Sequence, residues 1–133
     1  QFGLSIYDPQ DNTFFNIDDN LSARGRLNFY GVMDFCKDNL GNIWIATHKW
    51  IGISKLPGPG YLLMYDIEKD SIIHYLPKNN ELPIVEGGVN SLVYDPARDF
   101  IWCGGDDGLT GFNSKSKKYL NVEAFLKMIQ DTK

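Results

Sequence analysis

The chain has 133 residues, 43% of them hydrophobic, and its 13 basic and 17 acidic residues leave a formal charge of −4. This length fits a single domain, and the apolar fraction is high enough for a folded core. No apolar run reaches the roughly 18 residues of a membrane helix, and nothing near the N-terminus resembles a signal peptide. The mild acidity, with no basic cluster, argues against nucleic acid as a partner.

Short apolar strands joined by polar turns recur along the chain. Three hairpins share one design, in which an apolar strand ending in an aromatic residue is followed by Asp or Asn and then by a second strand that carries Phe or Tyr. They lie at 3–17, 62–76 and 109–120. Asp and Asn suit the start of such a turn because their side chains accept hydrogen bonds from the backbone two residues on.

A second type of hairpin lies between these three. Residues 31–47 and 88–104 each run from an apolar strand through a turn that begins with Asp to a strand that carries Trp44 or Trp102. The two tryptophans are 58 residues apart, as are the tyrosines that end the strands at 3–7 and 62–65. This spacing indicates an internal repeat.

The repeat divides the chain into a half unit at 3–17, whole units at 31–76 and 88–120, and an extension at 121–133. Each whole unit has four short strands, some of them apolar at nearly every position, which is typical of sheets buried on both faces. We therefore predict an all-β fold, a partial β-propeller of about two and a half four-stranded antiparallel blades with a short C-terminal helix. A β-sandwich is the alternative, although it does not predict a long repeat with the same turn chemistry.

One stretch resembles a known repeat family. Residues 32–47 contain an apolar strand, Asp38, and the run Gly41-Asn42-Ile43-Trp44, which is similar to the repeat of the two-component regulator propellers. Residues 4–9 look like the third strand of that repeat and its Tyr-Asp-Pro turn. The second copy departs from the pattern, because residues 96–99 replace the Gly-Asn turn. The resemblance covers about residues 3–120.

The resemblance implies a signalling role. Such repeats form the periplasmic sensor region of inner-membrane-anchored hybrid histidine kinases, many of which, notably in gut Bacteroidetes, respond to oligosaccharides. A closed propeller needs at least four blades. We therefore expect a fragment of a carbohydrate-responsive sensor whose partners are an oligosaccharide ligand and the remaining blades and kinase of the parent chain. A ring completed by other copies, as a homo-oligomer, is the alternative.

The expected ligand site lies on the loops between second and third strands and between blades, because propellers commonly bind ligands on that face. An exposed tryptophan beside basic groups suits the ring and hydroxyls of a sugar, and arginine suits acidic sugars. The candidate ligand-binding residues are Arg24, Arg26, Asn28, His48, Lys49, Trp50, Asp106 and Asp107. The competing interpretation is ordinary loop polarity, with Trp50 covering a neighbouring blade and the two aspartates in a structural turn rather than a cation site.

No catalytic or metal-binding pattern emerges, and we expect no enzyme activity and no cofactor. His48 and His74 lie outside any nucleophile or zinc motif. Cys36 and Cys103 are expected to be inert buried thiols rather than a disulfide or a metal pair. A propeller scaffold for protein–protein contacts or dimerisation is the rival function, and an enzymatic propeller such as a polysaccharide lyase ranks third.

Overall fold

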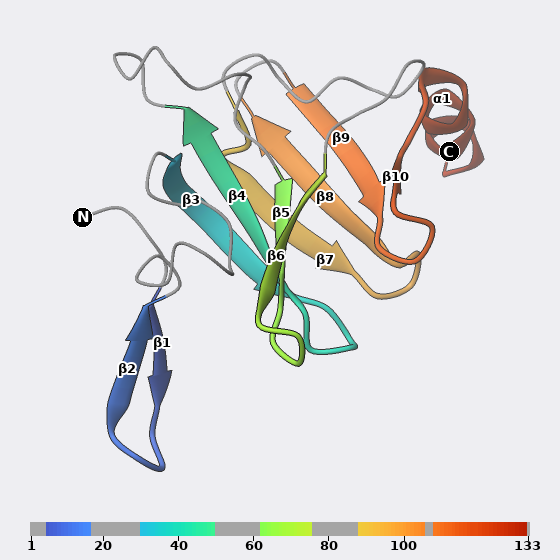
Figure 1. The fold of residues 1–133 in the computed structure, drawn as a ribbon. Coiled ribbons are helices and arrows are strands. Elements are labelled where there is room, and N and C mark those ends of the chain that lie inside the picture. The colour runs from blue at the N-terminus through green and yellow to red at the C-terminus, as the bar shows by residue number, and fades with distance from the viewer. Residues whose placement is uncertain (1–4, 17–29, 50–61, 76–87, 106–107, 133) are drawn as a thin grey trace.

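The computed structural model describes residues 5–16, 30–49, 62–75, 88–105 and 108–132. These residues form strands and one C-terminal helix (Figure 1). In chain order the elements are β1 (Ser5–Asp8), β2 (Thr13–Asn16), β3 (Tyr30–Lys37), β4 (Ile43–Lys49), β5 (Leu62–Asp66), β6 (Ser71–Tyr75), β7 (Ser91–Asp95), β8 (Phe100–Gly105), β9 (Gly108–Asn113), β10 (Lys118–Tyr119) and α1 (Val122–Asp131).

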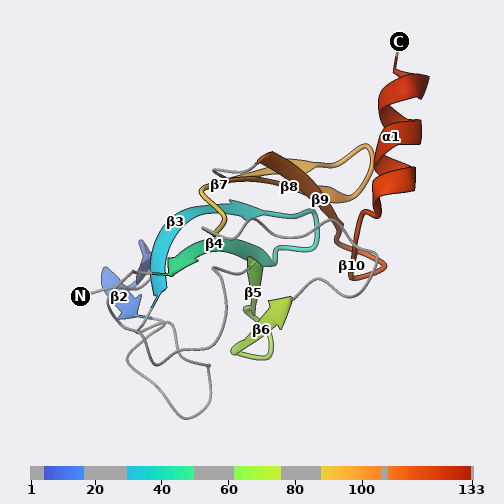
Figure 2. The same cartoon turned by 90° about the horizontal axis from the view of Figure 1, so that it is seen from above.

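The strands pair antiparallel in three sheets. Strands β1 and β2 form a hairpin, and two four-stranded sheets have the orders β3-β4-β5-β6 and β7-β8-β9-β10. Viewed from above, β7, β8 and β9 lie as a layer beside β3 and β4 (Figure 2). Four-stranded antiparallel sheets whose strand order follows the chain, stacked face to face, are the blades of a β-propeller. The predicted fold class, a partial propeller with a short C-terminal helix, is therefore confirmed.

Four of the hairpin turns share a local geometry. In three of them the side chain of the first residue accepts a hydrogen bond from the backbone N–H two residues on, as from Gln10 N to Asp8 Oδ1 at 2.8 Å and from Ala97 N to Asp95 Oδ1 at 3.0 Å. In the fourth, Asp66 Oδ1 accepts from Lys69 N, three residues on, at 3.1 Å. The fifth residue of each turn adopts a positive φ between 49° and 58°, and these residues are Asn12, Asp70, Asp99 and Lys117. The left-handed conformation lets the chain reverse after five residues. The turn chemistry expected for Asp and Asn is confirmed.

An apolar core lies between the two four-stranded sheets, and we call this interface the seam. Its buried members are Trp44, Ala46, Leu62 and Met64 from one sheet, and Val89, Leu92, Ile101, Cys103, Phe112 and Tyr119 from the other or from the segment before it. Trp44 is fully buried, and its ring centroid lies 5.3 Å from that of Phe112. Trp44 therefore packs between the two blades.

Polar contacts fix how the sheets face one another across the seam. The Asp34 carboxylate accepts a hydrogen bond from the backbone N–H of Leu92 at 2.7 Å. A register shift between Val32 and Asp34 precedes this contact, and such bulges re-aim side chains. At another point of the seam, the Tyr119 hydroxyl donates to the Tyr75 carbonyl at 2.9 Å. These bonds are directional, so they set the position of the sheets where apolar packing alone would allow sliding.

The other face of the sheet β3–β6 carries a smaller core. Ile45, Leu63 and Tyr65 are buried there, and Ile6 of the hairpin β1–β2 packs against them. The three sheets therefore follow one another as successive layers, with the sheet β3–β6 in the middle. The alternation of side chains along β4 explains this arrangement, because Trp44 and Ile45 point to opposite faces.

Helix α1 begins at Val122, directly after its capping residue. The side chain of Asn121 caps it by accepting a hydrogen bond from Ala124 N at 2.7 Å. The helix projects beyond the sheets (Figures 1 and 2), and Leu126 and Ile129 remain 52% and 40% exposed. A side chain at N-cap that satisfies a backbone donor stabilises the first turn of a helix.

Two local expectations differ from the structure. A strand was expected from residue 88, but β7 begins at Ser91, because the N–H of Val89 donates to the Thr47 carbonyl of the neighbouring sheet at 3.3 Å. Trp102 occupies the position equivalent to Trp44, yet it is half-buried. Trp102 lies on the face of its sheet that points away from the seam, whereas Ile101 and Cys103 point into it.

Candidate functional site

The strands of both blades bring their loop connections to one end of the molecule, which we call the loop end. Strand β4 ends there with His48 opposite Gly31 and Lys49 opposite Tyr30. Strand β8 ends with Gly105 opposite Gly108. The two strand ends lie together, because Val89 N donates to Thr47 O at 3.3 Å and Asn90 N donates to Gly104 O at 2.8 Å.

The sequence placed His48 and Lys49 in a loop, but the structure extends β4 through both residues, and their backbones lie at this loop end because the strand pairing with β3 continues to Tyr30. The side chains of these two residues lie outside the described part of the structure, as do the other candidates, Arg24, Arg26, Asn28, Trp50, Asp106 and Asp107. The candidate ligand site therefore stays a prediction.

The opposite end, which we call the turn end, holds the Asp-initiated turns. Asp38 is 6% exposed and accepts hydrogen bonds from Leu40 N at 2.9 Å, Asn42 N at 3.0 Å, Asn42 Nδ2 at 3.0 Å and Trp44 Nε1 at 2.9 Å. Burial raises the pKa of Asp38, but the four hydrogen bonds outweigh it and hold the pKa below its usual value. The carboxylate thus ties the turn to the tryptophan of the core.

A second aspartate repeats this arrangement in the next blade. Asp95 accepts hydrogen bonds from Arg98 Nη1 at 2.8 Å and from Trp102 Nε1 at 3.3 Å. The hydrogen bond from Arg98 is the main cause that lowers the pKa of Asp95. Asp38 and Asp95 therefore have the same structural task, which is to hold a turn against a tryptophan.

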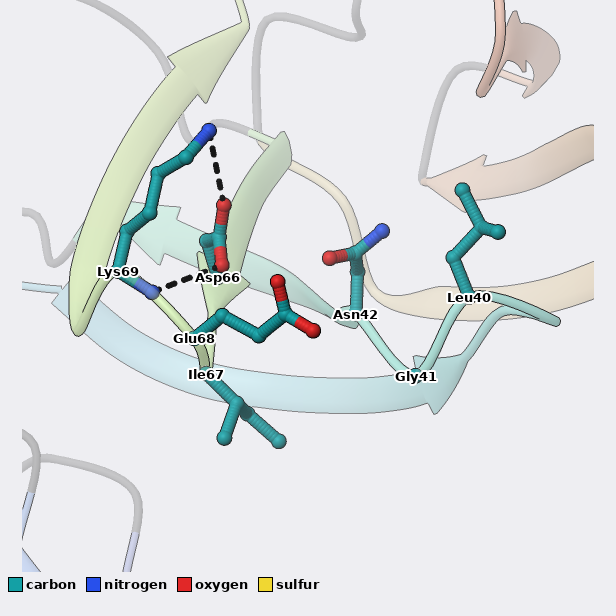
Figure 3. A pocket seen from close by; sticks show the side chains of 7 residues that line it. All are labelled: Leu40, Gly41, Asn42, Asp66, Ile67, Glu68 and Lys69. Atoms are coloured by element: carbon teal, nitrogen blue, oxygen red, sulfur yellow. Dashed lines mark hydrogen bonds and ion pairs between the residues drawn. The ribbon is translucent and has the colours of Figure 1, made fainter.

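A cavity of about 290 Å³ lies between two turns of the first whole blade (Figure 3). Its lining residues are Leu40, Gly41, Asn42, Asp66, Ile67, Glu68 and Lys69. Within it, Asp66 Oδ2 lies 3.5 Å from Lys69 Nζ, and Asp66 Oδ1 accepts the N–H of Lys69 at 3.1 Å. The lining has no imidazole, thiol or hydroxyl group. Its Asp66–Lys69 ion pair joins two residues of the same turn and stabilises that turn. The cavity therefore offers no nucleophile with an adjacent base.

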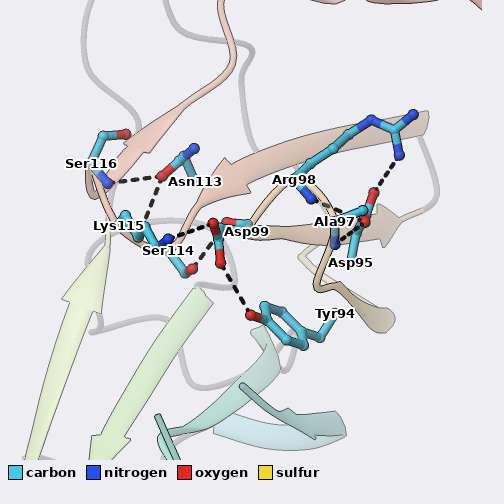
Figure 4. Close-up of polar contacts among 9 residues, drawn as sticks. All are labelled: Tyr94, Asp95, Ala97, Arg98, Asp99, Asn113, Ser114, Lys115 and Ser116. Atoms are coloured by element: carbon cyan, nitrogen blue, oxygen red, sulfur yellow. Dashed lines mark hydrogen bonds and ion pairs between the residues drawn. The ribbon is translucent and has the colours of Figure 1, made fainter. Parts of the chain in front are cut away.

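The polar groups in the two turns of the second whole blade form hydrogen bonds and an ion pair with one another (Figure 4). Asp99 accepts the Tyr94 hydroxyl at 3.3 Å and pairs with Lys115 Nζ at 2.9 Å, while its carbonyl accepts both the N–H and the hydroxyl of Ser114. The hydrogen bond to Asp99 raises the pKa of Lys115. These charges are already paired within the blade, so this part of the turn end acts as a clamp between strands.

The seam contains ionisable groups with shifted pKa values. Burial raises the pKa of Cys36 to about 11 and raises that of Cys103 further. Both cysteines are free in the structure, with Cys103 buried and Cys36 half-buried. The ammonium of Lys117 lies 5.0 Å from the ring centroid of Trp44. Burial lowers the pKa of Lys117, and the negative charge of Asp38 offsets part of this effect. None of these groups lines the cavity between the two turns of the first whole blade.

Among the residues that the structure describes, no three His, Cys, Asp or Glu side chains gather closely enough to hold a metal ion. Within the same ranges, α1 is too short and too polar to cross a bilayer.

Residues 26–49 match the family model described as two component regulator propeller. The matched residues include β3, the turn held by Asp38, and β4 with Trp44, which are the first two strands of a whole blade. A search of curated proteins found none that matches the chain. Residues 26–49 are thus similar to one repeat of that family, and residues 30–49 lie within a propeller-like blade.

Two contacts that organise this propeller segment were not foreseen from the sequence. The Asp34–Leu92 bond crosses the seam between residues 58 positions apart, which is the spacing of the repeat. A carboxylate in the otherwise apolar strand 31–36 is the signal that points to it, because a charged group in a buried strand needs a donor. The Asp38–Trp44 bond has its signal in the six-residue spacing of a turn aspartate and a tryptophan, repeated with seven at Asp95 and Trp102.

Proposed function

We propose that this chain is part of the extracytoplasmic ligand-sensing propeller of a two-component sensor histidine kinase, and that its ligand is an oligosaccharide. The match of residues 26–49 to the regulator propeller repeat is the observation that carries the proposal. On this reading the segment lies in the periplasm, has no catalytic activity of its own, and acts through the kinase of the parent chain.

The course of β4 is compatible with a ligand site at the loop end. Strand β4 runs from the turn end to the loop end, and its last residue, Lys49, immediately precedes Trp50 in the sequence. The paired charges at the turn end favour a structural task for that end. A ligand bound at the loop end would shift the packing of blades or of sensor domains, and the kinase would respond to that shift in population.

Isothermal titration calorimetry of the full sensor ectodomain against neutral and acidic oligosaccharides tests the proposal. We expect heat of binding from at least one glycan class and its loss in Trp50→Ala. The matched control is Trp102→Ala. Trp102 lies within strand β8 and not in a loop, and its indole N–H already donates a hydrogen bond to Asp95 at 3.3 Å. No heat of binding from any glycan of the panel, or an equal loss of binding in both variants, would overturn the proposal. Either result would favour a scaffold that makes protein contacts without a small ligand.

A further inference from the structure

The two whole blades differ in what lies between their two turns at the turn end. In the second blade, the carboxylate of Asp99 in the first turn pairs with the ammonium of Lys115 in the second turn at 2.9 Å (Figure 4). In the first blade, the space between the two turns is the cavity of about 290 Å³ (Figure 3). An ion pair therefore joins the turns of one blade, whereas a cavity separates the turns of the other.

Gly41 occupies the position in the first blade that Asp99 has in the second. Each lies two residues before the isoleucine of its second strand, Ile43 or Ile101, and each has a positive φ, of 85° and 55°. Among the described residues, none beyond the chain neighbours of Gly41 comes within 4 Å of the place where a Cβ would lie. The first turn of the first blade thus has no carboxylate at this position, and the space for one is open.

Glu68 occupies the position of Lys115. Tyr65 and Phe112 are the strand partners of the two isoleucines, and Glu68 and Lys115 each lie three residues after them. The charge at this position is therefore reversed between the blades. Among the residues that the structure describes, the carboxylate of Glu68 forms no ion pair.

The cavity presents hydrogen-bond acceptors to a ligand. Figure 3 shows the side chain of Glu68 extending from its own turn toward Asn42 of the other turn. The amide nitrogen of Asn42 donates to Asp38 at 3.0 Å, and its side-chain oxygen points to the side of the cavity on which Glu68 lies. Lys69 is the cation of the lining, and its ammonium lies 3.5 Å from the carboxylate of Asp66. A positively charged group that donates hydrogen bonds complements this lining.

We propose that this cavity binds a primary ammonium group on an aliphatic stem. The ammonium donates to the carboxylate of Glu68 and to Asn42 Oδ1, and it supplies the positive charge that the second blade takes from Lys115. The stem contacts Leu40 and Ile67, which line the cavity and are 82% and 52% exposed. A free alkylamine and the lysine side chain of a peptide carry this same group. The site lies at the turn end, so it does not depend on the sugar site proposed at the loop end.

Amide NMR spectra of the isotope-labelled 133-residue chain, titrated with n-butylamine hydrochloride at constant ionic strength, test the proposal. We expect the signals of Gly41, Asn42 and Glu68 to shift until they saturate. Glu68→Gln should weaken binding about tenfold or more, because a hydrogen bond to a charged group is lost. Asp11→Asn is the matched control, since it removes the same charge from an exposed position in the turn of the hairpin β1–β2.

A double variant tests the correspondence between the blades. Gly41→Asp combined with Glu68→Lys builds the ion pair of the second blade into the first, and a Cβ at Gly41 has room. Aspartate tolerates a positive φ better than most residues, and Asp99 has one in the second blade. The double variant should keep a dispersed amide spectrum, and n-butylamine should no longer shift its signals.

Two further probes define what the cavity recognises. n-Butanol has the stem without the charge and should bind at least about tenfold more weakly than n-butylamine. Tighter binding of a lysine peptide blocked at both ends would support a protein as the source of the ammonium, and equal or weaker binding would support a free amine.

Several results would overturn the proposal. These are the absence of saturable shifts in the wild type with both amine probes, and equal dissociation constants for the wild type and Glu68→Gln. Equal weakening by Glu68→Gln and by Asp11→Asn would do the same, because binding would then follow the net charge of the chain. Binding of n-butanol as tight as that of n-butylamine, or continued binding by the folded double variant, would also overturn it.

Discussion

Replacing Asp38 with asparagine removes one oxygen from a carboxylate that accepts four hydrogen bonds. The remaining amide oxygen can keep the bonds from Leu40 N and Asn42 N, both made to Oδ1. The new amide nitrogen stands where Oδ2 accepts the indole N–H of Trp44 at 2.9 Å and the side chain of Asn42 at 3.0 Å. The N–H groups of Trp44 and Asn42 then both face the new amide nitrogen, which is itself a donor. The buried indole N–H is left without an acceptor.

The magnitude follows from what each group can do next. The Asn42 side chain is half-buried and can turn to water, but Trp44 is 0% exposed and cannot. An orphaned buried donor costs about 1–3 kcal/mol, and the lost charge assistance adds to this, so we expect Asp38→Asn to lower the free energy of unfolding by about 3 kcal/mol. For a domain of this size that corresponds to a drop of roughly 10 °C in Tm.

Asp95→Asn is the matched control in the same chain. Its tryptophan is half-buried, the indole bond is longer at 3.3 Å, and its partner Arg98 lies at the surface, where an ion pair is worth about 1 kcal/mol or less. Differential scanning calorimetry of both variants at pH 7 measures the contrast. Equal losses at Asp38 and Asp95 would refute the argument that burial of the acceptor network sets the cost.

The pH dependence of the same variant gives a second check. Because the folded state lowers the pKa of Asp38, its contribution to stability is present above the pKa of the unfolded chain and is lost as the pH falls through the lower folded value. The Tm difference between the wild type and Asp38→Asn should therefore shrink below about pH 4. A difference that is constant from pH 7 to pH 3 would show that the charge of Asp38 is not its source.

Two further predictions concern the seam. Thr110 is 2% exposed and, among the described residues, its hydroxyl has no hydrogen-bond partner, so Thr110→Val should raise the free energy of unfolding by about 1 kcal/mol in urea titration, and a loss of stability would contradict this. The pKa of Cys36 is about 11 in the folded chain and that of Cys103 is higher still, so both thiols should resist alkylation at pH 8 until the chain is unfolded. Because these pKa values are raised in the folded state, the free energy of unfolding of the wild type should fall as the pH rises from about 9 toward 11, and it should fall less in Cys36→Ala. The same pH profile of stability in the wild type and in Cys36→Ala would contradict this prediction.

The repeat and its turns could be predicted from the sequence because they depend on neighbours along the chain. A turn that begins with Asp8 or Asp95 is set by the reach of a short side chain to the backbone two residues on. Alternation along β4 likewise places Trp44 and Ile45 on opposite faces without any knowledge of what covers them. The cap at Asn121 follows from the same kind of local chemistry.

The candidate ligand residues show where local reasoning reaches its limit. The sequence predicted the strand up to Thr47 and placed His48 and Lys49 in the following loop, whereas the structure extends β4 through both residues. Whether Trp50 and Arg24 converge on one ligand depends on how loops from different blades approach each other, which no local pattern encodes. That part of the prediction awaits the binding experiment.

Sequence alone therefore determined the blade as a unit: its four strands, its turns and the tryptophan of its second strand. The tertiary structure decided which copy of each repeated position is covered. Trp44 and Trp102 have the same local setting, yet one is fully buried and the other half-buried, because burial depends on the sheet that lies opposite and not on the residues alongside. The contact between Asp34 and Leu92 likewise required two strands 58 residues apart to lie side by side.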